Sequence, residues 1–192
     1  MPPGDRARPT TDRVREALFS AITAWAGRAA EPVERSLSGL AFCDLYAASG
    51  AVGLEAASRG ATRVLLIERE PRTAQLGRRN AEALGLRVDV VISSVERILR
   101  RPPASPFDIV FADPPYDLDT ATVSAQIEQL VLNSWVDRGS LIVVERSSRT
   151  PPLLWPDAAT RRWSRAYGET ILSFGSLEPG SSRTAPDRAP PC

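Results

Sequence analysis

Four residues near the middle of the chain bring together an acid, two prolines and an aromatic ring, Asp113-Pro114-Pro115-Tyr116. They follow the apolar run 109–112, whose lack of alternation is typical of a strand covered on both faces of a parallel sheet. Proline fixes φ and has no N–H, so the strand must end there and the carbonyls of Asp113 and Pro114 become rigid acceptors. Those acceptors could bind N–H donors, and Tyr116 could stack on a flat ring. A proline-terminated strand with an aromatic lid would give the same pattern.

A second candidate site is the small-residue turn 47–53, which follows a predicted strand at 40–46 and opens a predicted helix. Small residues let the backbone approach a ligand at a helix N-terminus, the usual place for a nucleotide-like cofactor in an open α/β sheet. The next predicted strand, 64–67, leads into Glu68, about 20 residues beyond the turn, where an acid can accept both ribose hydroxyls. Glu68 could otherwise be a solvated strand end.

Composition excludes several kinds of catalytic centre. The chain has no histidine and only two cysteines, Cys43 and Cys192, so a Ser/His/Asp centre, a Cys/His centre and a Cys/His metal site are all excluded. Cys43 lies in an apolar run and is predicted to be a core residue. We therefore expect a site without metal.

The basic residues are all arginine, and the formal net charge of +1 gives no general attraction to nucleic acid. They gather in three clusters: Arg6, Arg8, Arg13 and Arg15; Arg97, Arg100 and Arg101; Arg161, Arg162 and Arg165. Such clusters are usually solvated faces, and the first is the strongest candidate for contact with nucleic acid.

The length of 192 residues suits one domain. We predict a flexible arm at 1–9, one domain at 10–175 and a disordered tail at 176–192. Since neither a signal peptide nor an apolar run of about 18 residues is present, we expect a soluble cytoplasmic protein with no membrane contact.

Strands and helices alternate five times along the domain. The predicted helices are 12–27, 51–60, 71–85, 95–99 and 120–132, and the predicted strands are 40–46, 64–68, 88–92, 109–112 and 141–145, with a hairpin at 161–166 and 170–174. This order predicts the α/β class, a doubly wound sheet of five parallel strands with helices on both faces, followed by a C-terminal antiparallel hairpin.

Several segments together resemble a known family. They are RPTTDRVREALF at 8–19, DLY at 44–46, SGAVGLEA at 49–56, SRGA at 58–61, Asn80 and the DPPY segment at 113–116. Their order is similar to that of class I S-adenosylmethionine-dependent methyltransferases with a Rossmann-like fold. The opening segment is similar to one family in particular, the bacterial 16S rRNA guanine-N2 methyltransferases known as small-subunit rRNA methyltransferase D.

The resemblance implies a seven-stranded sheet with its last strand antiparallel, a monomeric enzyme, and S-adenosylmethionine as methyl donor, with S-adenosylhomocysteine as product. The acceptor would be the N2 amino group of one guanine, guanine 966 for the family, in 16S rRNA, within a 30S subunit or assembly intermediate. The resemblance implies these cofactor-binding residues: Asp44, Ala48, Gly50, Glu68, Ser94 and Asp113. It places catalysis on Asp113, Pro114 and Tyr116, and RNA binding on Arg8, Arg13, Arg15 and Tyr116.

Three departures from the family pattern stand out. Ala48 replaces the central glycine of the turn, and Ser93 or Ser94 replaces an acid that accepts from the adenine amino group. The Gly/Arg-rich hairpin with which the family begins is missing before Met1, so we expect either a truncated start or reduced affinity for RNA.

Other functions fit parts of the pattern. An adenine-N6 methyltransferase acting on DNA or RNA would use the same acceptors, and only the segment 8–19 indicates guanine. A spacing of Ala48, Gly50 and Gly53 followed by Glu68 also approximates a dinucleotide fingerprint, which would indicate an NAD-binding protein. A non-catalytic RNA-binding module is the third alternative.

Overall fold

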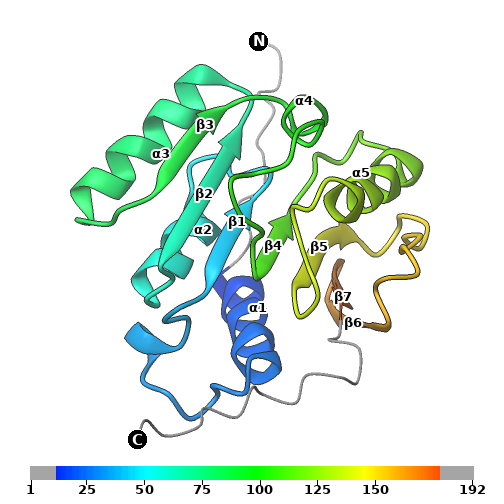
Figure 1. Cartoon of the computed structure of the whole chain (residues 1–192), viewed down its shortest axis with the longest axis horizontal. Helices are drawn as coiled ribbons and strands as arrows, with labels where there is room; N and C mark the ends of the chain where they lie inside the picture. The colour runs from blue at the N-terminus through cyan, green and yellow to red at the C-terminus, as the bar shows by residue number, and fades with distance from the viewer. Residues whose placement is uncertain (1–11, 178–192) are drawn as a thin grey trace, which may run out of the picture.

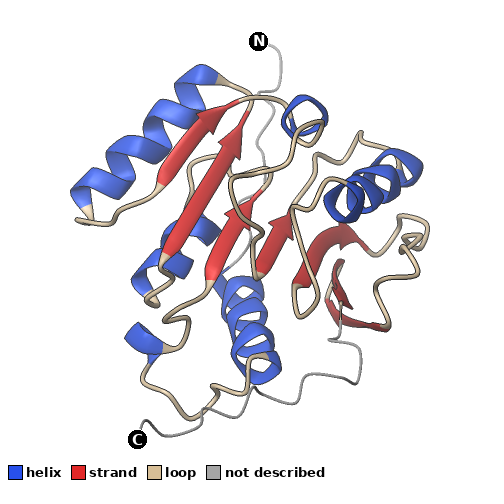
Figure 2. Ribbon diagram, viewed as in Figure 1, coloured by secondary structure: helices blue, strands red, loops and turns tan. Residues whose placement is uncertain are grey.

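A computed structural model describes residues 12–177 of the chain (Figures 1 and 2). The helices are α1 (Asp12–Trp25), the short 3₁₀ helix η1 (Val33–Arg35), α2 (Ala51–Ser58), α3 (Pro71–Ala83), α4 (Val95–Ile98) and α5 (Thr120–Leu132). The strands are β1 (Ala41–Asp44), β2 (Arg63–Glu68), β3 (Asp89–Ile92), β4 (Ile109–Ala112), β5 (Leu141–Ser147), β6 (Arg161–Tyr167) and β7 (Thr170–Ser176).

The seven strands form one sheet in the order β3-β2-β1-β4-β5-β7-β6. Strands β1 to β5 are parallel, and β7 runs antiparallel to both of its neighbours, β5 and β6. The carboxyl ends of the parallel strands lie toward the top of Figure 1. The doubly wound α/β fold with a C-terminal antiparallel hairpin, predicted from the alternation of elements, is confirmed.

Two apolar cores cover the two faces of the sheet. Helices α1 and α2 pack on one face against side chains such as Phe42 and Phe111. Helix α5, together with the loop that precedes β4, covers the other face, over Val110, Ile142 and their neighbours. Cys43 is buried in this second core as a free thiol, as predicted. Helices on both faces leave the carboxyl edge of the sheet as the place where polar residues gather.

Local sequence starts the helices around that edge. Glu70 accepts from the Arg72 N–H at 3.3 Å and precedes a proline at the first turn of α3. Asp119 accepts from the Thr122 N–H at 2.8 Å at the start of α5. Capping of this kind satisfies backbone donors that no helical turn can reach.

Some boundaries differ from those predicted. The first strand ends at Asp44 rather than at residue 46. The Leu45 N–H still donates to the Phe111 carbonyl of β4, and the Ala47 N–H donates to the Ile67 carbonyl of β2, but the backbone between them no longer follows the regular pairing of a strand. The fold also runs into the predicted tail, since β7 ends at Ser176 and Leu177 is buried in the second core.

The predicted arm at 1–9 lies outside the described residues, as does the remainder of the predicted tail. Between Asp12 and Leu177, no helix has both the length and the apolar character needed to cross a membrane.

Candidate active site

The turn after β1 requires backbone conformations that side chains disfavour. Ala48 has φ +47° and Gly50 has φ +88°, both in the left-handed region. The turn is closed by a 2.7 Å hydrogen bond from the Gly50 N–H to the Ala47 carbonyl. An L-residue costs about 1 to 2 kcal/mol in this region, whereas glycine does not. The alanine at position 48 is therefore accommodated under strain.

The two glycines of the turn face the sheet. A Cβ at Gly53 would lie 2.1 Å from the Leu66 side chain, and one at Gly50 would lie 3.1 Å from it. The sequence suggested that small residues here let a ligand approach. In the structure, the absence of side chains at Gly50 and Gly53 brings α2 directly against β2, and this fixes the position of the turn.

Glu68 closes the turn from the end of β2. Its Oε2 accepts from the Ala48 N–H at 2.9 Å and its Oε1 accepts from the Glu70 N–H at 2.7 Å. The side chain is half-buried, so each oxygen keeps a lone pair that another donor can use. The acid thus holds the strained residue of the turn in place and remains an acceptor.

Asp44 is buried beneath the same turn, with 2% of its surface exposed. Its Oδ2 accepts from the Gly53 N–H at 3.3 Å, while Oδ1 has no hydrogen-bond partner among the described residues. Burial raises the pKa of Asp44 to about 7, against hydrogen bonds from the Gly53 and Tyr46 N–H groups that lower it. The negative charge of Glu68 raises the pKa further.

Asp113 lies directly after β4, which pairs with β1. Burial raises the pKa of Asp113 to about 8, and the negative charges of Glu145 and Asp44 raise it further, while Arg146 lowers it. The carboxylate accepts no hydrogen bond from a described residue, and neither does the Pro114 carbonyl. The Asp113 carboxylate and the Pro114 carbonyl are therefore available to a ligand as acceptors.

Tyr116 completes the predicted trio, with 68% of its surface exposed. It lines a small pocket with Asp113 and Pro114. The wall opposite is formed by residues from β5, the following loop and β7: Glu145, Arg146, Ser147, Thr150 and Thr170. The pocket is too small to enclose a base, so a flat ring would lie at its mouth, beside the Asp113 and Pro114 acceptors and the exposed ring of Tyr116.

Arg146 was not predicted as a site residue. It is buried on β5, and its Nη2 donates to the Leu118 carbonyl at 2.8 Å, so it holds the loop that carries Asp113 to Tyr116. Its Nε and Nη1 have no partner among the described residues. Two consecutive charged residues, Glu145 and Arg146, after the apolar run 141–144 were the available signal, because a charged residue is almost never buried without a specific reason.

Below this site, Tyr46, Gln126 and Glu96 form a chain of hydrogen bonds. The Tyr46 hydroxyl donates to Gln126 Oε1 at 2.6 Å, and Gln126 Nε2 donates to Glu96 at 2.8 Å. Burial raises the pKa of Tyr46 to about 12. The chain connects the end of β1 to α5 and α4, so the elements beneath the site are fixed relative to one another.

The other predicted residues are more dispersed. Ser94 caps α4 by accepting from the Arg97 N–H at 3.3 Å, and the adjacent Ser93 N–H donates to the Glu68 carbonyl at 3.1 Å, so this pair lies beside Glu68. Arg15 forms a 2.7 Å ion pair with Asp12 on α1. Neither Arg15 nor Arg13 lines the Asp113 pocket, and Arg8 lies outside the described residues.

The carboxylates at this edge fit S-adenosylmethionine, because its sulfonium and ammonium groups are cationic. The unpartnered Oδ1 of Asp44 is a buried acceptor at the turn, and Glu68 and Asp113 place further carboxylates along the same edge. Burying like charges together is costly unless a cation arrives. Residues 12–177 hold no group of His, Cys, Asp and Glu suited to a metal ion.

Comparison with known proteins decides the family. A family model described as Conserved hypothetical protein 95 matches residues 1–176. The chain belongs to this family. The Ribosomal RNA small subunit methyltransferase D of Haemophilus influenzae is 32% identical over 171 residues, covering 87% of this chain and 80% of the relative. The same-named protein of Escherichia coli is 35% identical over 145 residues, covering 76% and 67%. The family resemblance predicted from the sequence is confirmed.

Solved structures agree with the fold. An Escherichia coli protein described as a candidate methyltransferase has a TM-score of 0.76 and 28% identity, covering 90% of each chain. A Thermus thermophilus 16S rRNA N2 G1207 methyltransferase, solved with AdoMet and guanosine, has a TM-score of 0.70 at 20% identity, covering 92% of this chain and 46% of that one. The second likeness supports the class I methyltransferase fold alone.

Proposed function

We propose that this protein is an S-adenosylmethionine-dependent rRNA methyltransferase that methylates the exocyclic N2 amino group of a guanine in 16S rRNA. The observation that carries the proposal is the pair of fixed acceptors after β4, the Asp113 carboxylate and the Pro114 carbonyl, beside the exposed Tyr116. Membership of the family supports rRNA as the substrate, because its relatives are named as rRNA methyltransferases.

The acceptors address the chemical difficulty of this reaction. An exocyclic amino group is a poor nucleophile because its lone pair is delocalised into the ring. When Asp113 and Pro114 accept hydrogen bonds from its two N–H groups, the lone pair of the amino nitrogen is turned out of conjugation and toward the methyl group. Most of the rate then comes from positioning and electrostatics, without a general-base histidine.

The cofactor supplies a methyl group on a positively charged sulfur. Asp44 and Glu68 would hold its polar ends, and the turn at Ala48 and Gly50 would form the floor of its site. The bound cofactor would supply the methyl group to the amino nitrogen, with the C–S electron pair remaining on sulfur, while Asp113 and Pro114 would orient that nitrogen toward it. The nitrogen then loses a proton, which Asp113 can accept because burial raises its pKa to about 8.

Tyr116 has a separate role in this proposal. A base must leave its stack to reach an enclosed acceptor site, and stacking on an aromatic ring is worth about 1 to 3 kcal/mol. We expect Tyr116→Phe to keep much of the activity, because it keeps the stacking face, and Tyr116→Ala to lose it.

The test offers radiolabelled S-adenosylmethionine and the full chain to 16S rRNA and to 30S particles that lack the modification. The labelled base is then mapped. We expect N2-methylguanine, and a fall of at least about 100-fold in rate for Asp113→Asn, the size of effect seen when one electrostatic contact to a transition state is removed. Asp117→Asn, an exposed acid on the same loop, is the matched control and should keep its rate.

Three results would contradict the proposal. Label on adenine would assign the alternative adenine-N6 activity, which uses the same acceptors. Full activity of Asp113→Asn would remove the proposed mechanism. Absence of label from both RNA and particles, with intact cofactor binding, would leave a cofactor-binding protein that acts elsewhere. Comparing naked RNA with 30S particles also tests whether the acceptor belongs to an assembled subunit.

A further inference from the structure

A long groove lies outside the site described above, on the α4 face of the sheet. We call it the α4 groove. Its floor is formed by β2 and β3, and its rim by α4 and the loop that follows it. The residues that matter for its chemistry are Leu65, Val91, Ile92, Arg97, Arg100 and Arg101.

The groove exists because this face of the sheet is only partly covered. Helix α4 is four residues long, and the chain then continues through Pro102 and Pro103, which cannot extend a helix. The face of β2 and β3 beneath therefore keeps accessible apolar side chains. Leu65 and Val91 are half-buried, and Ile92 has 44% of its surface exposed. The floor of the α4 groove is thus apolar and open.

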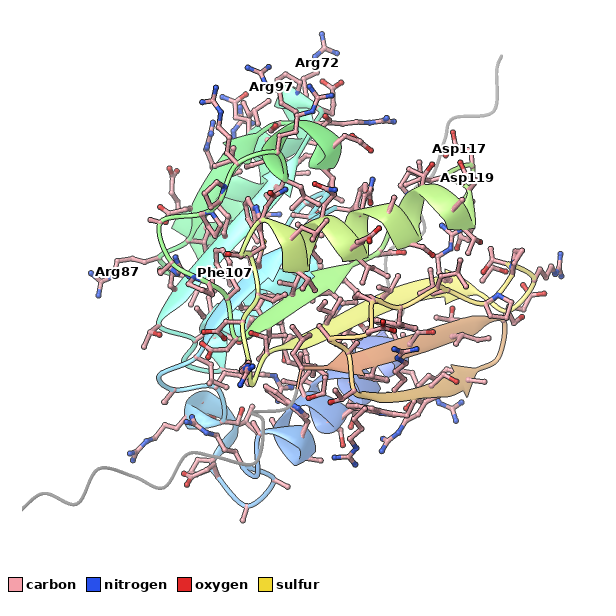
Figure 3. All side chains as sticks on the ribbon, turned by 45° about the vertical axis from the view of Figure 1, so that its right-hand side comes forward. Arg72, Arg87, Arg97, Phe107, Asp117 and Asp119 are labelled. Carbon is pink, nitrogen blue, oxygen red and sulfur yellow. The ribbon has the colours of Figure 1, made fainter. Side chains whose placement is uncertain are left out.

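The rim is strongly basic. Arg97, Arg100 and Arg101 are exposed, and none of their guanidinium groups has an ion pair or hydrogen bond with a described residue. Asp89 is the one acid among the described lining residues. Figure 3 shows Arg97 and Arg72 projecting from the same corner of the molecule, while Asp117 and Asp119 project from the other end of the carboxyl edge. The basic rim therefore lies on one side of the candidate active site, and these two acids lie on the other.

A fourth arginine in the groove has a different role. Arg63 donates to the Ser105 and Pro106 carbonyls at 2.9 and 2.5 Å, and its guanidinium lies 3.9 Å from the centre of the Phe107 ring. These contacts fix the loop 101–106, so Arg63 shapes the groove wall. The three arginines of the rim have no such contacts among the described residues and remain free to bind a ligand.

One end of the α4 groove reaches the carboxyl edge of the sheet. Ser93 lines it, and the Ser93 N–H donates to the Glu68 carbonyl at the carboxyl edge. A chain lying in the groove would therefore run up to the edge where the cofactor and acceptor residues gather. An apolar floor with separated cations on its rim matches single-stranded nucleic acid, because bases lie against apolar surface while phosphates meet arginines.

We propose that the α4 groove binds a single-stranded RNA segment flanking the methylated nucleotide, with Arg97, Arg100 and Arg101 contacting successive phosphates. The identity of the RNA rests on the proposed function above. The groove would hold the substrate on the side of the sheet opposite α1, and so would act in addition to the arginines near the start of the chain.

The experiment measures affinity of the full chain for a short labelled single-stranded RNA as salt is varied. We expect the triple variant Arg97→Gln, Arg100→Gln, Arg101→Gln to bind at least about tenfold more weakly at low salt. The slope of log affinity against log salt should flatten by about 2, since each phosphate contact on a single strand contributes about 0.7. The matched control replaces three exposed arginines outside the groove, Arg35, Arg79 and Arg138, by glutamine and should keep the slope.

A thermal unfolding midpoint close to that of the unmodified chain would show that the triple variant is folded, because the replaced side chains are exposed. Native affinity and slope in a folded triple variant would overturn the proposal, as would an equal loss in the control, which would indicate a general charge effect. Equal competition by an acidic peptide of matched charge would assign the groove to a protein segment and also overturn it.

The groove and the proposed function fail in different ways. If the unmodified chain binds RNA through the groove but transfers no methyl group to rRNA, the proposed function fails while the groove assignment is supported. If the triple variant methylates rRNA at the same rate as the unmodified chain when both are given the same RNA concentration, the groove assignment fails while the function is supported.

Discussion

Replacing Asp113 by asparagine should stabilise the fold while removing activity. The carboxyl group is held beside Glu145 and Asp44 in a largely buried position that raises its pKa to about 8, from an ordinary value of 3.8. Because the folded state binds this proton more tightly than the unfolded state, stability falls as the pH rises from about 4 to about 8. Asparagine has the same shape and no charge to desolvate, so it avoids this loss.

The size of the effect follows from the raised pKa. Each pH unit between the two pKa values contributes at most about 1.4 kcal/mol. We expect the free energy of unfolding of Asp113→Asn to exceed that of the unmodified chain by about 1 to 2 kcal/mol at pH 5 and by about 4 to 5 kcal/mol at pH 8. At roughly 2 to 4 °C per kcal/mol for a chain of this size, the difference in Tm should grow by roughly 5 to 10 °C over that range.

Thermal unfolding of the protein without cofactor, followed by circular dichroism at a series of pH values, measures this growth. Asp119→Asn is the control. Asp119 is fully exposed at the start of α5, and hydrogen bonds from Thr122 lower its pKa, so its contribution has the opposite dependence on pH. A Tm difference for Asp113→Asn that is the same at pH 5 and pH 8, or that shrinks as the pH rises, would refute the reasoning.

Three further predictions concern the turn, the ribose acceptor and the loop anchor. Ala48→Gly should raise the free energy of unfolding by about 0.5 to 1 kcal/mol, because relief of φ +47° outweighs the entropy that glycine gives the unfolded chain; a loss in denaturant unfolding would contradict this. Glu68→Ala should weaken S-adenosylmethionine binding by about 1.5 to 3 kcal/mol in titration calorimetry, and unchanged affinity would remove Glu68 from the cofactor site. Arg146→Met keeps the packing but removes the charge that lowers the pKa of Asp113, so the acid limb of the pH–rate profile should move to higher pH; an unmoved profile would leave Arg146 only a packing role.

The sequence alone predicted the fold class and the position of the site within it. The continuous apolar runs identified the buried parallel strands, and the proline pair after Asp113 predicted where β4 stops. The small-residue run after the first strand predicted a turn there, which the structure has. These features are local: they depend on the conformations that a few adjacent residues can adopt, so a chain can be interpreted for them without knowing its neighbours in space.

Other boundaries needed the assembled sheet. The end of the domain was placed at 175, yet Ser176 closes β7 and accepts from Trp25 Nε1 at 3.1 Å, and Leu177 packs into the second core. Leu177 is the one large aliphatic residue in 176–192, but a single apolar residue followed by a polar stretch rich in proline does not by itself predict a packed segment. Ser176 and Leu177 belong to the folded domain because they contact α1 and β5, which are distant in sequence.

Only the tertiary structure decided the electrostatics of the site. Asp44 and Asp113 are 69 positions apart in the numbering, but the pairing of β1 with β4 brings their charges close enough to raise the pKa of Asp113. Contacts between other distant elements place Glu68 on the Ala48 N–H and Arg146 on the Leu118 carbonyl. They also leave three arginines above a face of β2 and β3 that no helix covers. Such long-range contacts have no periodic signature along the chain, because they depend on how the strands are ordered in the sheet and on which helices are too short to cover it.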